Sequence, residues 1–188
     1  KTYPDLNIKG RTQYTAKIGQ YPSVCMIYKG VPAGHPDEKP LETALALLHN
    51  SSATGALDKL SIDGEITNGS ASLEANRQQG RCKIAVTPLY DENKRRFESN
   101  KSAEKKALKA IQQIANGEVE DWIIDAIKTN MCREFDQVME ASENKALILL
   151  QAFINEEDLG QVLNYKDEIM AINIDDIKRV AKQYLSND

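Results

Sequence analysis

The segment His35-Pro36-Asp37-Glu38-Lys39 places a histidine and a glutamate three residues apart, the spacing used by one zinc motif. In the motif His-x-x-Glu-His, the two histidines bind the metal and the glutamate is the base that activates water. Here Lys39 stands where the second histidine should be, and a lysine that is protonated near pH 7 repels a cation. Pro36 and Pro40 also prevent a regular helix from holding both His35 and Lys39. We therefore interpret the segment as a loop followed by a helix start, and predict no metal there.

The only other histidine, His49, follows Leu48 near the expected end of a helix. At that position an imidazole can bond the last carbonyl groups or interact with the helix dipole. Even together, His35 and His49 lack carboxylates in a recognisable ligand pattern. We predict that neither histidine has a metal-ligating or catalytic role.

Cysteines and serines were considered as nucleophiles. Cys25, Cys82 and Cys132 are odd in number and form no Cys-x-x-Cys pair, which argues against a structural zinc site. We expect buried free thiols, because nothing near Cys25 or Cys132 supports pairing with a histidine. Ser51 and Ser52 lie outside any Gly-x-Ser-x-Gly elbow and are expected to be turn-forming hydroxyls.

Charged clusters are the remaining candidates. Asp37–Glu38 and Glu156–Asp158 lie at expected helix starts, where the dipole favours acids. The basic runs Lys94–Arg96 and Lys105–Lys106 are interpreted as solvated, with contact to a peptide carboxylate or a partner as the alternative. The sequence therefore predicts no catalytic residue and no metal ligand, and it leaves substrate-binding residues unknown.

Composition narrows the class of protein. The chain has 188 residues, 24 basic against 28 acidic, and a net charge of −4. A chain of this length forms one large or two small domains and buries about 70% of its unfolded surface. It therefore needs no disulfide bond or bound metal to stabilise the fold. The charge argues against a general binder of nucleic acids or anionic membranes.

The ends of the chain suggest processing. No run of 18 apolar residues is present, so we expect no membrane span. The chain starts at Lys1 without an initiator methionine or a signal peptide, which we take to indicate a processed protein or an excised piece. The compartment stays open; a periplasmic or otherwise exported location is one alternative for a bacterial parent.

The first half of the chain alternates strands and helices. Residues 1–21 are expected to be an extended lead-in, followed by a single domain over 22–188. Residues 23–29 predict a strand covered on both faces. A helix is predicted from Asp37, with Pro40 in its first turn, and a short second helix ends before Asp63-Gly64. The apolar face of the first helix is predicted to be Leu41, Ala44, Leu45, Leu47 and Leu48.

Two antiparallel strands follow, and then a helical half. Period-two patterning predicts strands over 65–75 and 81–88, joined by a polar hairpin, with the charge run 91–96 as a loop. Apolar stripes of period 3.6 predict helices starting near Ala103, Val119, Ala146, Leu159 and Asn173. The predicted fold class is α+β, an antiparallel or mixed sheet with helices packed on one face.

Four segments, in this order, resemble the insulinase/pitrilysin family of zinc metallopeptidases, which includes mitochondrial processing peptidase. Residues 28–37 resemble its strand, Pro…Asp loop and helix start, and residues 45–57 resemble its small-residue turn between two helices. Residues 118–130 resemble a helix that begins after glycine. Residues 173–185 match the closing helix and are the most specific of the four. The resemblance spans about residues 22–187.

The resemblance implies a domain of a larger peptidase. Family members combine homologous α/β domains, of which one carries His-x-x-Glu-His and a distal glutamate and the next lacks them. This chain is similar to the next one. The implied function is a non-catalytic domain that forms part of a peptide-binding chamber. Zinc is expected in the catalytic domain of the parent and no cofactor in this segment. The implied partners are that catalytic domain, or a homologous subunit, and a peptide substrate, with no nucleic acid.

Two questions stay open at this point. The family's non-catalytic half can supply an arginine and a tyrosine to substrate, but the spacing of Arg77, Arg81 and Tyr90 supports no assignment. The alternative function is a catalytically inactive scaffold or partner-binding subunit, as in the respiratory complex III relatives. Whether the parent is an enzyme therefore rests on a domain outside this sequence.

Overall fold

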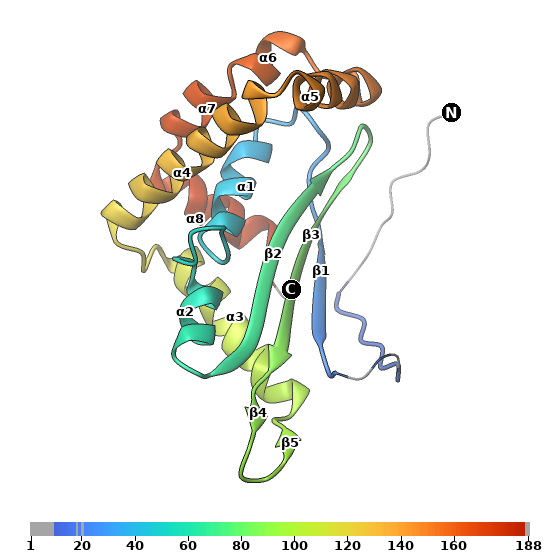
Figure 1. Cartoon of the computed structure of the whole chain (residues 1–188), viewed down its shortest axis with the longest axis vertical. Coiled ribbons are helices and arrows are strands. Elements are labelled where there is room, and N and C mark those ends of the chain that lie inside the picture. Colours follow the sequence, from blue (N-terminus) through green and yellow to red (C-terminus); the bar gives the residue numbers. More distant parts are fainter. Residues whose placement is uncertain (1–9, 18, 20, 187–188) are drawn as a thin grey trace.

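The computed structural model describes residues 10–17, 19 and 21–186 as an α+β domain (Figure 1). Its strands are β1 (Val24–Lys29), β2 (Ile66–Ala75), β3 (Gly80–Pro88), β4 (Tyr90–Asp91) and β5 (Arg96–Phe97). Its helices are α1 (Glu38–Ala46), α2 (Ala56–Ile62), α3 (Asn100–Asn116), α4 (Asp121–Glu140), α5 (Ser142–Asn155), α6 (Leu159–Leu163), α7 (Tyr165–Ala171) and α8 (Ile174–Tyr184). The predicted fold class is confirmed.

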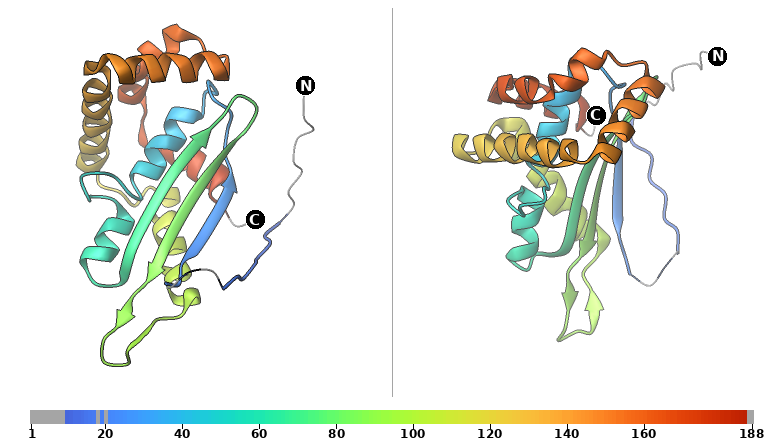
Figure 2. Two further views of the ribbon diagram at one scale, coloured as in Figure 1. Left: turned by 45° about the vertical axis from the view of Figure 1, so that its right-hand side comes forward. Right: turned by 45° about the horizontal axis from the view of Figure 1, so that its top comes forward.

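The main sheet is antiparallel with strand order β1-β3-β2. Its register pairs Met26 with Ile84 and Ile84 with Ala71, so that one set of alternating side chains shares a face. Cys82, Ile84 and Val86 of the central strand are fully buried on that face. The helices pack against it, and none of the described helices lies on the opposite face (Figure 2).

Several helix ends lie where the sequence predicts them. All five apolar residues named for the first helix are buried. The α3 helix ends at Gly117, which has φ +76°, and α8 begins at Asn173, whose side chain accepts from the amides of Asp175 and Asp176. The buried ammonium of Lys128 on α4 donates to the carbonyls of Met170 and Ile172, both at 2.7 Å, and so attaches the end of α7.

The carboxylate of Asp37 joins the start of α1 to the last helix. The residue occupies the N-cap position, but its side chain caps no helix amide. Instead it accepts from Arg179 Nη2 at 2.6 Å and from the Tyr184 hydroxyl at 2.7 Å. Hydrogen bonding to Arg179 outweighs partial burial and lowers the pKa of Asp37, and burial together with Asp37 raises the pKa of Tyr184 to about 12.

Several expectations require correction. The strand β1 is covered on one face only, because Cys25 and Ile27 are exposed on the side without helices. Of the three cysteines only Cys82 is buried, and Cys132 is half-buried. The charge run 91–96 is not a simple loop, since its ends pair as β4 and β5, and the predicted fourth helix is divided into α6 and α7 at Asn164.

The lead-in forms no helix or strand in residues 10–17, 19 and 21, and its remaining residues lie outside the described part of the chain. The division into a lead-in over 1–21 and a domain over 22–188 stays a prediction.

Replacing Asp37 by asparagine tests the bond between the first and last helices. At pH 7 we expect a loss of about 2 to 3 kcal/mol in the free energy of unfolding, because a buried charged acceptor is removed from two donors. The folded-state pKa is depressed, so this contribution is present above pH about 4 and is lost as pH falls through the folded value.

Urea unfolding of both chains at several pH values measures this difference. Wild type and Asp37→Asn should converge at low pH, while the exposed control Asp63→Asn should match wild type throughout. A constant difference down to pH about 2.5 would contradict the assignment.

Candidate functional site

A cavity of about 570 Å³ lies beside the free edge of the sheet. Its walls come from α1, the turn after α1, the β2 segment Ala71–Leu73, α4 and α5. Apolar side chains supply part of the lining, among them Leu45, Ile127 and Ile148. A cavity of this volume, with a few polar groups among apolar walls, is of the kind that binds a ligand or a side chain.

Polar groups gather at one wall of the cavity. Lys39 Nζ lies 3.1 Å from Glu38 Oε1, 3.9 Å from Glu42 Oε2 and 5.1 Å from the centre of the Tyr165 ring. The Tyr165 hydroxyl donates to Glu42 Oε1 at 3.1 Å, and its ring stacks on Phe135 with centroids 4.8 Å apart. Lys39 thus links α1 to α7, and the stacking of Phe135 on Tyr165 adds α4 to the cluster.

The crowded surroundings shift the titration of this cluster. Desolvation raises the pKa of Glu42, against the opposing effects of Lys39 and Tyr165. Burial would lower the pKa of Lys39, but the carboxylates of Glu42 and Glu38 outweigh it and raise that pKa. Burial and Glu42 also raise the pKa of Tyr165. Lys39 is therefore a cation at neutral pH, unable to act as a base.

The free edge of β2 forms another wall. Because β2 is the outer strand of the order β1-β3-β2, one edge of its backbone is unpaired within the sheet. Residues Ala71, Ser72 and Leu73 of this strand line the cavity. An unpaired strand edge offers amide and carbonyl groups to an extended peptide, and an adjacent cavity offers room for its side chains.

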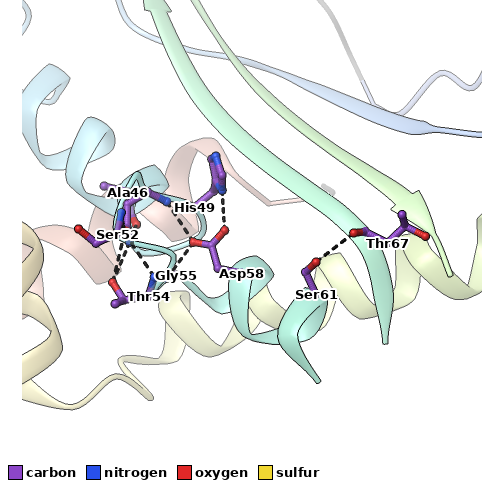
Figure 3. Close-up of polar contacts among 9 residues, drawn as sticks. Ala46, His49, Ser52, Thr54, Gly55, Asp58, Ser61 and Thr67 are labelled. Carbon is purple, nitrogen blue, oxygen red and sulfur yellow. Dashed lines mark hydrogen bonds and ion pairs between the residues drawn. The ribbon is translucent and has the colours of Figure 1, made fainter. Parts of the chain in front are cut away.

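His49 belongs to a structural network at the turn after α1 (Figure 3). Its Nδ1 lies 2.6 Å from Asp58 Oδ1, and Asp58 Oδ2 accepts from the amides of Asn50 at 3.1 Å and Gly55 at 3.0 Å. Asn50 Nδ2 in turn donates to the carbonyl of Ala46 at 3.0 Å. The carboxylate therefore holds the α1–α2 turn closed.

The turn also depends on a close backbone approach. A Cβ added at Gly55 would lie 2.4 Å from the carbonyl oxygen of Leu48, a fixed backbone atom. Only glycine fits this close approach to the backbone of Leu48. The approach places the amide of Gly55 within reach of the Asp58 carboxylate.

His35, Lys39 and His49, for which the sequence predicts no metal, are each engaged by neighbouring groups. His35 Nδ1 accepts from the Asp37 amide at 3.0 Å before α1, whereas His49 lies after α1 and contacts Asp58. Lys39 lies between Glu38 and Glu42, so the position of a second ligand holds a paired cation. Among the described residues, no three His, Cys, Asp or Glu side chains gather as a possible metal site.

The serines and cysteines are dispersed. Ser51 donates to Glu134 at the cavity, and Ser52 Oγ accepts from Asn130 at 3.0 Å. Cys25 lies on β1, while Cys132 Sγ is 3.9 Å from the carbonyl of Lys166. In the part of the chain that the structure describes, no hydrogen bond joins a serine or cysteine to a histidine.

The charged candidates also separate. Arg77 pairs with Glu156, Arg81 pairs with Glu74, and Tyr90 packs edge-on against Phe97. Lys94 pairs with Asp91 and Lys106 with Glu98. Asp158 caps α6 as expected, whereas Glu156 ends α5 in a left-handed conformation.

Sequence reasoning missed the Glu42–Tyr165 pair and the cavity. The two residues are 123 positions apart, so no local sequence pattern predicts their contact.

Comparison with known proteins identifies the fold but no close relative. No protein-family model matches the sequence, and no curated protein matches it. Solved structures do match, at low sequence identity.

A protease from Helicobacter pylori superposes with a TM-score of 0.75 at 18% identity, over 88% of this chain and 38% of the other. The inactive peptidase domain of a Bordetella parapertussis protein assigned as a zinc protease gives 0.74 at 18%, over 90% and 89%. The inactive domain of an M16 peptidase from Pseudomonas fluorescens gives 0.71 at 13%, over 88% and 38%. The chain thus has the fold of inactive M16-type peptidase domains, and spans well under half of the Helicobacter and Pseudomonas chains.

Replacing Asp58 by alanine tests the network at the α1–α2 turn. We expect a loss of about 2 to 4 kcal/mol in the free energy of unfolding, because the buried amide of Gly55 and the half-buried amide of Asn50 lose their acceptor. Thermal and urea unfolding measure it. Ser61→Ala on the same helix removes the 3.0 Å bond to the Thr67 carbonyl and serves as the control, with an expected loss below about 1 kcal/mol. Equal losses in the two variants would contradict a special role for the carboxylate.

Proposed function

We propose that this chain is a non-catalytic domain of a zinc-dependent peptidase, and that it forms part of the wall of a peptide-binding chamber. The observation that carries the proposal is the match to inactive peptidase domains over nearly the whole chain. The position of Lys39 between Glu38 and Glu42 supports it, because this cation stands where the second histidine ligand of a zinc motif would be. The metal of the parent then belongs to a separate catalytic domain.

The cavity beside β2 suggests how such a wall contributes. An extended peptide can pair with the backbone of Ala71–Leu73 and place a side chain in the cavity. The role of the domain is then to position substrate, while hydrolysis by a zinc-activated water takes place elsewhere in the parent.

The isolated chain should hold no zinc and cleave no peptide. After dialysis against a zinc-containing buffer and then a metal-free one, we expect well below one zinc per chain by metal analysis. A quenched fluorescent peptide mixture should stay intact over a long incubation. One tightly held zinc per chain, with cleavage that a chelator abolishes, would refute the proposal.

The peptide-binding role predicts a local response to unstructured peptides. Addition of a tryptic digest of a reduced and alkylated protein should shift the backbone amide resonances of Ser70–Leu73 in an NMR spectrum. Lys83 and Ala85 of the central strand are paired with residues of both β1 and β2, so their amide resonances should be unaffected. Shifts confined to other parts of the surface would contradict binding at the β2 edge.

A second candidate function is an inactive scaffold or partner-binding subunit, which the same fold allows. The reading frame around this segment separates the two. A His-x-x-Glu-His motif within about 200 preceding residues supports the peptidase domain, and a complete gene that begins near Lys1 supports the scaffold.

A further inference from the structure

The outer face of α5 is apolar and open to solvent. Leu147, Leu150 and Phe153 are 58%, 53% and 78% exposed, and Leu149 and Ile154 are 40% and 54% exposed. The helix instead turns a narrow side inward, where Ala152 and Asn155 are buried and Ile148 lines the cavity. With about 100° between successive residues, the exposed side chains cover the whole side opposite the buried one.

Such a face is unusual for a surface helix. From Ala146 to Ile154 it carries no charged side chain, whereas surface helices place charged residues on the side away from the core. The exposed apolar area is on the order of 500 Å², in the range where patches on soluble proteins mark interaction sites. In the following helix, α6, Leu159 and Leu163 are also exposed, at 50% and 59%.

Acidic residues bound this apolar face at both ends. Glu140 and Glu143 lie exposed at its start, where Lys145 follows on the same helix. Glu156 and Asp158 lie exposed at its end, with Glu157 half-buried between them and Arg77 paired to Glu156. Each end therefore keeps a net negative charge after these cations are counted.

This charge pattern decides between occupants. If two copies of the chain packed α5 against α5, acidic ends would meet acidic ends in both the parallel and the antiparallel arrangement. Like charges brought together across an interface oppose association. A bilayer with anionic headgroups is disfavoured for the same reason. A protein segment with basic residues at both ends is complementary.

We propose that the outer face of α5 is a docking surface for a helix of another protein domain, apolar along one face and basic at both ends. The apolar side chains supply the buried area, centred on Phe153 and Leu150, and the acidic ends set orientation and partner choice. The proposal uses a different surface from the cavity and the β2 edge, so it stands or falls separately from the proposed function.

Two synthetic peptides serve as probes. Each is an amphipathic helix of about 18 residues with a leucine face; one has lysine and arginine at both ends, and the other has glutamate there. Fluorescence anisotropy with the full chain should show at least about tenfold tighter binding of the basic peptide. Raising the salt concentration from about 0.05 to about 0.5 M should weaken that binding, because the end charges are screened.

Variants connect the binding to α5. Leu150→Asp with Phe153→Asp should weaken the basic peptide at least about tenfold, and should leave the melting temperature close to wild type because both side chains are exposed. Ile62→Asp is the matched control, since Ile62 is 72% exposed on α2, and it should bind as wild type.

Four results would overturn the proposal. The acidic peptide could bind as tightly as the basic one, or the α5 variant could bind unchanged. Light scattering could instead show a dimer that Phe153→Asp dissociates, which would assign the face to a second copy. Sedimentation with phosphatidylcholine vesicles that depends on Phe153 would assign it to a membrane surface.

Discussion

The attachment of the first helix to the last is the constraint on which the rest of this domain depends. A three-stranded sheet with one bare face cannot bury a core unless helices from distant parts of the chain cover the other face. Asp37 meets Arg179 and Tyr184 across 142 and 147 positions, next to the buried contact between α1 and α8. With that bond made, Leu41 and Leu45 of α1 and Ile177 and Val180 of α8 share one core. The position of α1 then fixes the cavity wall and the turn after it.

The same placement explains why the segment His35–Lys39 offers no set of zinc ligands among the described residues. His35 and His49 are separated by the length of α1, and each is engaged by a neighbouring backbone or carboxylate. Lys39 is used to neutralise Glu38 and Glu42 where the cavity meets Tyr165. A cation paired in this way stabilises this wall of the cavity, and removing either carboxylate would leave Lys39 with only one of these two partners.

At α5 the hydrophobic pattern of the sequence does not match the burial in the structure. The stripe Ala146 to Ile154 predicts a helix, and a helix forms there, yet most of the stripe faces solvent. Local periodicity reports that side chains can share a face, but which face packs on the core depends on where α4 ends and on the small residue Ala152 that contacts the body of the domain. The narrow buried side and the wide open one together produce the surface on which docking is proposed.

The sequence by itself determined the elements and the fold class. Period-two patterning located β2 and β3, period-3.6 stripes located α1, α3 and α8, and Gly117 and Asn173 marked helix ends because glycine accepts positive φ and asparagine caps amides. It also predicts no metal site at His35, Lys39 and His49, because the ligands of the zinc motif occur at fixed spacings along one helix and these residues do not have them. Only the tertiary structure decided which face of β1 and α5 is exposed, that Asp37 binds α8 and caps no amide, and that Glu42 meets Tyr165 beside a cavity. Those contacts join residues far apart in the chain, and their geometry is set by packing, which no local pattern encodes.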